Sequence, residues 1–389
     1  MTISTPPAAA AGPDTDPATG PSLARGPLGT ALLDIEQARR GLLPWQVVDR
    51  RLARPDARPL TDDDDASLFS GAPAMAYVLH LAADGADRYA DVLRTLDGIV
   101  AALTRRRLVA AHDRIDQGRY ASYAEYDLMS GLTGLGALLL RRRPDSGELK
   151  SVLRYLVRLT EPVSGPQGQP RPGWWVGHAP GLNAPAAPGG HAASGPAHGI
   201  AGPLSLLALA KRRGITVDDH DIAMSRICGW LDRIRQIAWD GARWPQWVSG
   251  AGSAPVRATA PAWCHGTPGL ARAQQLAAIA LADDDRKRMA ERALLYCLAD
   301  TRQLDQLTNR GLRHGIGGLM RTLQRVSEDA EGPSSFTSRL PELRARFRAL
   351  SPPEQTGFLD GAAGADLAFQ STEPDSGPAA DWDACLLLA

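Results

Sequence analysis

Residue types that bind metals or transfer protons stand shortly before glycines at five places in the chain. They are Asp127 with Ser130, His198, Cys264 with His265, Arg313 with His314, and Asp360. Thiols, imidazoles and carboxylates are the usual ligands of zinc, and imidazoles and carboxylates also serve as general acids and bases. If the fold gathers these side chains around one cavity, the sequence predicts a metal site with proton-transfer groups beside it.

The four cysteines are widely spaced and form no CxxC pair. This pattern argues against a disulfide framework and favours reduced thiols. Cys228, Cys297 and Cys385 lie in apolar helical runs, where a buried and unreactive thiol is the ordinary interpretation. Cys264 has a different neighbourhood, with His265 directly after it, and it is therefore the thiol that we expect to do chemistry.

The glycines belong to a repeat, a short apolar helix that opens with two glycines three positions apart. Its copies are SGLTGLGALLL at 130–140, HGIAGPLSLLALA at 198–210, HGTPGLARAQQLA at 265–277, HGIGGLMRTLQ at 314–324, DGAAGADLAFQ at 360–370 and a degenerate SGAPAMAYVLHLA at 70–82. Glycine in a helix costs about 0.5 to 1 kcal/mol relative to alanine, so the repeat needs a reason. Either the glycines admit a neighbouring backbone or a ligand to the first helical turn, or they only ease tight turns into packed helices.

Amphipathic segments alternate with the glycine-opened ones. They span 88–104, 148–160, 221–238, 285–302 and 336–350. Each has apolar residues at helical spacing and a charged opposite face, whereas alternation of period two is scarce. An apolar inner helix alternating with an amphipathic outer helix predicts an all-α fold, an α/α toroid made of a double ring of inner and outer helices.

The charge balance and hydropathy exclude several classes of function. The chain has 389 residues, 44% of them hydrophobic, and its 43 basic side chains balance its 43 acidic ones. Such a surface has no field to gather nucleic acid or anionic lipid, so we expect no nucleic-acid partner. No apolar stretch reaches the roughly 18 residues that cross a bilayer. We therefore expect a cytoplasmic protein without a membrane span.

Local composition predicts the domain organisation. Residues 1–30 are rich in Ala, Pro, Thr and Gly, without a basic start and an apolar run, so we expect a disordered N-terminal segment that is not a signal peptide. Residues 31–389 are predicted to form a single toroid domain. Within it, residues 160–195 are rich in Pro and Gly, and we expect a long loop over or beside the cavity. His178 and His191 are alternative ligands from this loop, but an exposed loop histidine is the favoured interpretation of both.

From about residue 60 to its end, the chain resembles the lanthionine synthetase C-like cyclases. The motifs that carry the resemblance are YDLMSGLTGLGALLL, PGWW at 172–175, GPAHGIAGPLSLL, WPQWV at 244–248, PAWCHGTPGLARA, LRHGIGGL, GFLDGAAG and DWDACLLLA. The resemblance implies an α/α toroid in which zinc, held by two cysteines and one histidine, activates a cysteine thiol of a peptide. That thiol adds to dehydroalanine or dehydrobutyrine and closes a thioether ring. The implied partners are a precursor peptide with dehydrated Ser and Thr and a dehydratase.

The resemblance also implies roles for particular residues. It assigns zinc ligation to Cys264 and His314, and acid/base or orienting roles to Asp127 and His198. Read without the resemblance, Asp127 would be an ordinary carboxylate at a helix N-terminus and His198 a capping or packed histidine. With it, we expect both side chains to take part in proton transfer.

Three positions at the expected cavity depart from the family pattern. Arg313 stands where the second zinc-binding cysteine is expected, and a guanidinium cannot ligate a metal. His265 stands where relatives have a tyrosine, and Ala260 replaces an arginine that is common four positions before the cysteine. All three changes affect the site, whereas the motifs of the scaffold are intact.

These departures leave several hypotheses. In the first, His265 supplies the missing ligand of a zinc site made of Cys264, His265 and His314, and Arg257 covers for the absent arginine. Adjacent side chains diverge by about 100 degrees in a regular helix, so this geometry is demanding. In the second, the toroid binds no zinc and scaffolds the precursor peptide, or Arg313 is the cation that stabilises a thiolate or enolate.

A third hypothesis is a glycoside hydrolase that uses Asp127 and Asp360 as its pair of carboxylates, because helical toroids also host such pairs. The aromatic content of 5% is low for a cleft that stacks sugars. The cyclase hypothesis explains more of the motifs, and we carry it forward as the prediction.

Overall fold

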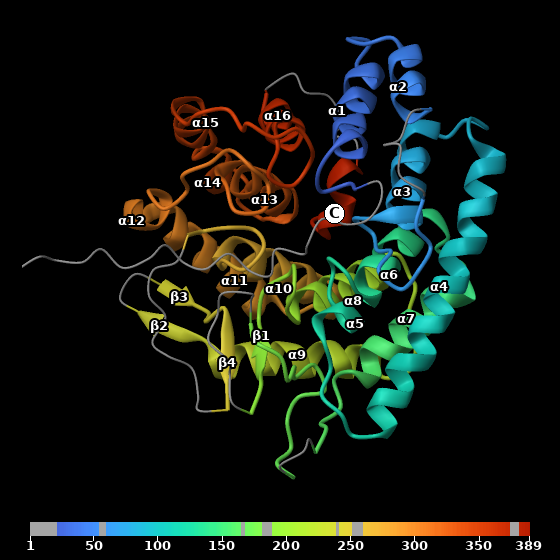
Figure 1. Cartoon of the computed structure of the whole chain (residues 1–389). Helices are drawn as coiled ribbons and strands as arrows, with labels where there is room; N and C mark the ends of the chain where they lie inside the picture. Colours follow the sequence, from blue (N-terminus) through green and yellow to red (C-terminus); the bar gives the residue numbers. More distant parts are fainter. Residues whose placement is uncertain are drawn as a thin grey trace, which may run out of the picture.

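The computed structural model describes residues 22–53, 60–164, 168–180, 189–238, 241–250, 260–373 and 381–389. Helices dominate these residues and form a double ring (Figure 1). None of the helices in the described ranges has the length and hydropathy that spanning a membrane requires.

The inner ring consists of the glycine-opened helices together with the first helix. In ring order its members are α1 (Pro27–Arg39), α3 (Gly71–Ala83), α6 (Leu132–Arg142), α8 (Ala201–Arg212), α10 (Thr267–Leu281), α13 (Ile316–Asp329) and α16 (Ala362–Ser371). Each contacts the next, and α16 returns to α1, so the ring closes (Figure 1). Most of their residues are buried. The predicted all-α toroid with an inner and an outer ring is confirmed.

The outer layer consists of amphipathic helices that pack on the inner ring. They are α2 (Trp45–Leu52), α4 (Ala90–Asp116), α7 (Gly147–Arg158), α9 (His220–Ile234), α11 (Asp284–Ala299) and α15 (Leu340–Ala349). Short helices connect some of the layers: α5 (Tyr123–Tyr126), α12 (Thr301–Leu304) and α14 (Ser334–Thr337). The apolar face of each outer helix covers an inner helix, as α11 covers α10 and α7 covers α6.

Several predicted helix boundaries are wrong. The segment 336–350, expected as one helix, is divided between the end of α14 and α15, which begins at Leu340. The helix expected over 88–104 continues to Asp116, because Leu108 and Ala111 extend its buried stripe. The helix expected over 221–238 ends at Ile234, because Gln236–Ala238 form strand β2, which pairs antiparallel with β3 (Gly241–Arg243).

The predicted N-terminal boundary also needs correction. Residue 30 falls inside α1, and Leu23 and Leu28 are buried in the main core. Since α1 contacts both α16 and α3, it is the helix that closes the inner ring. The described fold therefore begins at residue 22, eight residues before the predicted limit of residue 30, and residues 1–21 lie outside the described residues.

The segment expected to be a loop beside the cavity contains a short strand. Strand β1 (His191–Ala193) pairs antiparallel with β4 (Trp247–Ser249), and isolated bridges join Val176 to His191 and to Ala121. His178 is exposed as expected, but His191 is fully buried. The expectation that His191 is an exposed loop histidine is thus wrong, because the strand pairing draws it under the surface.

The paired glycines are explained by close approach of the preceding backbone. A Cβ atom on Gly318 would lie 1.9 Å from the carbonyl oxygen of Leu312, and one on Gly269 would lie 2.0 Å from that of Trp263. The same contact, with the carbonyl six residues earlier, recurs at Gly134, Gly202 and Gly364. Each loop therefore turns back tightly against the helix that follows it, which only glycine permits.

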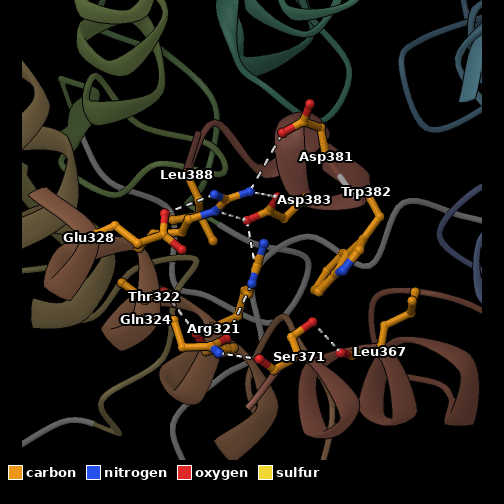
Figure 2. Close-up of polar contacts among 12 residues, drawn as sticks. Arg321, Thr322, Gln324, Glu328, Leu367, Ser371, Asp381, Trp382, Asp383 and Leu388 are labelled. Carbon is orange, nitrogen blue, oxygen red and sulfur yellow. Dashed lines mark hydrogen bonds and ion pairs between the residues drawn. The ribbon is translucent and has the colours of Figure 1, made fainter. Parts of the chain in front are cut away.

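The C-terminal segment fills the centre of the ring. Asp381–Leu386 form the 3-10 helix η1, and Asp383 is fully buried between two guanidinium groups of α13 (Figure 2). Arg321 Nε lies 2.8 Å from Asp383 Oδ2, and Arg325 reaches both carboxylate oxygens at 2.7 Å. Arg272 Nε of α10 donates to the carbonyl oxygen of Leu388 at 2.9 Å. Charged side chains of two inner helices thus hold the segment in place.

Candidate active site

One pocket lies where the loops before three inner helices meet. His198 precedes α8, Cys264 and His265 precede α10, and Arg313 and His314 precede α13. All five side chains line this pocket, whose empty volume is about 490 Å³ including space open to solvent. The tight glycine turns deliver these residues to one place from distant parts of the chain.

A second pocket lies in the outer layer between α4, α6 and α7, with an empty volume of about 750 Å³. It is lined by charged and apolar side chains, among them Asp97, Arg142 and Leu138. Within the described ranges no thiol or imidazole lines it. The smaller pocket is therefore the candidate active site, because it combines a thiol with three imidazoles.

Cys264, His265 and His314 form a cluster of potential metal ligands. One ligand atom from each lies within 4.8 Å of the other two. Cys264 Sγ and His265 Nδ1 are 2.9 Å apart, and the two imidazole rings are 5.5 Å apart between centroids. The divergence expected of adjacent helical side chains does not arise, because both residues lie in the turn before α10, which begins at Thr267.

The protonation states of this cluster suit a metal ligand set. Burial, helped by the neighbouring His314, lowers the pKa of His265 to about 4, so the ring is neutral and keeps a lone pair. Burial raises the pKa of the Cys264 thiol, which therefore stays protonated until a metal replaces the proton. One thiolate and two imidazoles fit zinc, with a fourth position left for water or substrate.

Arg313 is paired with a carboxylate. Its guanidinium lies 2.7 Å from Asp360 Oδ2, and 15% of the Arg313 side chain and 33% of the Asp360 side chain are exposed. A guanidinium alone beside the cluster would oppose a divalent cation, but the carboxylate offsets much of its charge. The arginine at the expected cysteine position is thus compatible with a cation at the three ligands.

Asp127 and His198 form a hydrogen-bonded pair beside the cluster. Asp127 Oδ2 lies 2.6 Å from His198 Nδ1, while Oδ1 accepts hydrogen bonds from the backbone N–H groups of Ser130 and Gly131 at 2.7 and 3.0 Å. Asp127 is fully buried, whereas His198 lines the pocket. The carboxylate therefore fixes the orientation of the imidazole, which can exchange a proton with a molecule in the pocket.

The carboxylate pair of the glycoside hydrolase hypothesis is not available for that chemistry. Asp127 lies behind His198, and Asp360 is engaged with Arg313. Neither is among the described residues that line the pocket. Of the remaining predicted positions, Ala260 lies just before the turn that carries Cys264, and Arg257 lies outside the described residues.

Sequence reasoning missed Tyr123, Gln246 and Trp247, which also line the pocket. Tyr123 begins α5, four residues before Asp127, so helical spacing from that carboxylate could have indicated it. Gln246 and Trp247 belong to the WPQWV motif, which had indicated the family resemblance but no role in the site. The roles of Cys264, His265, His314, Asp127, His198 and Arg313 remain predictions.

Comparisons with known proteins agree with this architecture. A solved structure of nisin cyclase superposes with a TM-score of 0.79 at 19% sequence identity, covering 96% of this chain and 93% of that one, and this likeness shows a shared fold. No curated protein sequence matches the chain. The family model described as lanthionine synthetase C-like protein matches residues 18–387. The chain therefore belongs to the lanthionine synthetase C-like family.

Proposed function

We propose that the protein is a zinc-dependent lanthipeptide cyclase, which adds cysteine thiols of a precursor peptide to dehydroalanine or dehydrobutyrine. The observation that carries the proposal is the convergence of Cys264, His265 and His314 in one pocket with the pair of His198 and Asp127. Family membership and the nisin cyclase fold support the same reaction class.

The ligand cluster would activate the substrate thiol, and the pair of His198 and Asp127 would transfer the protons. Zinc bound by Cys264, His265 and His314 would lower the pKa of a substrate thiol, so that the thiol reacts as a thiolate. His198, held by Asp127, is placed to take the thiol proton and to return a proton to the product carbon. Arg313, paired with Asp360, adds positive charge at the wall of the pocket where an enolate would form.

The proposal also defines the partners and the compartment. The substrate is a precursor peptide with dehydrated Ser and Thr, and a dehydratase must act before this protein because the alkene is its product. All four cysteines are free and buried. We infer a cytoplasmic location from them, because reduced thiols persist there.

The direct test uses a synthetic peptide that contains one dehydroalanine and one cysteine. The full-length chain should consume the free thiol much faster than buffer does, as measured by alkylation and mass spectrometry. Cys264→Ala should abolish this activity, whereas the matched control Cys228→Ala should retain it, because Cys228 is buried in α9 and does not line the pocket. Thiol loss at the rate of buffer alone would refute the proposal.

A second candidate function is favoured by Arg313 at the position of the expected cysteine ligand. In this alternative the toroid binds the precursor peptide without zinc and scaffolds a modification complex. It predicts a folded, metal-free chain that binds the peptide but leaves its thiol unchanged. Zinc content and thiol consumption therefore separate the two functions.

A further inference from the structure

Tyr123 and His191 form a hydrogen-bonded pair at the wall of the active-site pocket. Tyr123 lines the pocket, and its hydroxyl oxygen lies 2.5 Å from His191 Nε2. The Tyr123 ring also packs against that of His198, with centroids 5.6 Å apart. The pair is therefore adjacent to the proposed acid/base group, and neither member belongs to the ligand cluster.

The surroundings of His191 determine which atom donates the hydrogen bond. His191 Nδ1 is buried, and no described residue reaches it at hydrogen-bonding geometry. The backbone of His178 lies close enough to raise the pKa of the ring but does not meet that geometry, so we treat Nδ1 as unbonded. A buried N–H without an acceptor is costlier and rarer than an acceptor without a donor. Burial, helped by the neighbouring His178, lowers the pKa of His191 to about 4, so the ring is neutral. The favoured tautomer carries its proton on Nε2 and donates it to the Tyr123 oxygen.

In this tautomer the Tyr123 oxygen accepts the hydrogen bond from His191, so the hydroxyl hydrogen of Tyr123 is available to a different acceptor. Within the described part of the chain, His191 is the one hydrogen-bond partner of that hydroxyl. Burial raises the pKa of the Tyr123 phenol, so the hydroxyl keeps its proton at neutral pH. The pocket wall thus offers a neutral donor whose position is set by a buried histidine.

We propose that the Tyr123 hydroxyl, positioned by His191, donates a hydrogen bond to the carbonyl oxygen of the dehydrated substrate residue. This inference rests on the proposed cyclase function. As the sulfur bonds to the β-carbon, the π electron pair of the alkene moves to the α-carbon and the carbonyl, whose oxygen gains negative charge. A proton then bonds to the α-carbon, so the reaction adds S–H across the double bond and the phenol stays protonated.

The first test separates this role from packing. Tyr123→Phe should lower kcat for thioether formation about a hundredfold, the effect of losing one preorganised donor to an oxyanion. The KM for the peptide and the zinc content should stay near those of the wild type. Tyr155→Phe is the matched control, since it removes another buried hydroxyl, bonded to Glu125 outside the pocket, and should keep the wild-type kcat. A wild-type kcat in Tyr123→Phe would overturn the inference.

The second test concerns His191 and does not depend on activity. In the full chain labelled with 15N-histidine, the His191 signals, assigned by their loss in His191→Gln, should show a protonated Nε2 and a bare Nδ1. His191→Gln keeps a donor near Tyr123 and should retain much more kcat than His191→Leu. A protonated Nδ1, or equal kcat in the two variants, would contradict the positioning role.

Loss of the cyclase function and loss of the role of Tyr123 give different experimental results. If the wild-type chain forms no thioether, the proposed function is wrong whatever the tautomer of His191. If the wild type is active and Tyr123→Phe is equally active, the cyclase stands and only the role of Tyr123 is lost.

Discussion

Asp127 links the loop before α6 to His198 through its two carboxylate oxygens. One oxygen accepts from the backbone before α6, and the other bonds His198 Nδ1. A carboxylate in this position requires His198 to carry a proton on Nδ1, so the other ring nitrogen of the neutral imidazole is an acceptor. The reactivity of His198 therefore depends on a residue that does not itself line the pocket.

Asp127→Asn should separate these two effects. The amide oxygen can still accept from Ser130 and Gly131, but the amide N–H₂ group would face His198 Nδ1 and favour the opposite tautomer. We expect kcat for thioether formation to fall roughly 10²- to 10⁴-fold, the range for loss of a general acid or base, with little change in Tm. The control Asp232→Asn, in an ion pair with Arg286 of the outer layer, should keep its kcat. An unchanged kcat in Asp127→Asn would exclude the pair from the chemistry.

The environment of Arg313 could not be predicted from its identity in the sequence. Its identity predicted a conflict with a metal, but the ion pair with Asp360 offsets the charge, and their contact across the chain could not be read from spacing. His265 shows the opposite case. It was proposed as a substitute ligand, and the non-helical turn before α10 brings it to Cys264, which helical geometry had made doubtful.

The loops that precede the inner helices are the elements that assemble the site. Before α6, α8, α10, α13 and α16, a carbonyl presses against the second glycine of the repeat. In the loops before α8, α10 and α13, residues between that carbonyl and the glycine line the pocket. The repeat could be read from the sequence because its glycines recur at fixed spacing. The close approach of the backbone, and not ligand access, accounts for the glycine at the second position.

Gly318→Ala tests this explanation. Its Cβ would lie 1.9 Å from the carbonyl oxygen of Leu312, so we expect a loss of about 1 to 3 kcal/mol in the free energy of unfolding, typical of overpacking. Gly98→Ala is the control, because Gly98 lies within α4 with no atom within 4 Å of the added Cβ. It should stabilise the protein by about 0.5 to 1 kcal/mol. Denaturant unfolding measures both, and equal effects would contradict the explanation.

Helices could be predicted where apolar residues recur at helical spacing. Strands that form only by pairing with a remote segment could not. The inner helices appear within a few residues of their expected ranges because glycine and apolar runs mark them. The strands around His191 and Trp247 were not expected, since three-residue strands depend on a partner remote in the chain. For the same reason the buried state of His191, and its contact with Tyr123, escaped notice.

At the scale of the whole molecule, the ring is closed by its two ends. Helix α1 bridges α16 and α3, and η1 is fastened at the centre by the arginines of α13 (Figure 2). The hydroxyl of Tyr77 on α3 also donates to the carbonyl oxygen of Trp382 at 3.0 Å. The role of α1 in closing the ring was not predicted, because the composition of residues 22–30 resembles a disordered N-terminal segment. The anchoring of η1 was not predicted, because ion pairs between distant segments leave no local pattern in the sequence.

Protonation of the buried carboxylate of Asp383 should contribute strongly to the loss of stability in acid. The guanidinium groups of Arg321 and Arg325 hold its pKa well below the usual range despite full burial. Asp383→Asn leaves two buried cations less compensated, so we expect a loss of about 3 to 5 kcal/mol at pH 7. Because the folded pKa is depressed, this contribution is present above the ordinary aspartate pKa of about 4 and declines as the pH falls below it.

Unfolding of the wild type and of Asp383→Asn at several pH values measures this contribution. The difference between the two proteins should be constant near neutral pH and shrink in acid. Asp91→Asn, at an exposed ion pair with Arg94, should show no measurable change at any pH. A difference that grows as the pH falls would contradict the assigned role of Asp383.

The zinc content of the purified full-length chain is the decisive measurement, because the proposed chemistry depends on metal binding by Cys264, His265 and His314. After dialysis, elemental analysis should find about one zinc per chain in the wild type, as expected for three protein ligands with an open position. His265→Ala should lose the metal while remaining folded, and the control His112→Ala on outer helix α4 should keep it. A folded wild-type chain without zinc, or full zinc in His265→Ala, would contradict the account.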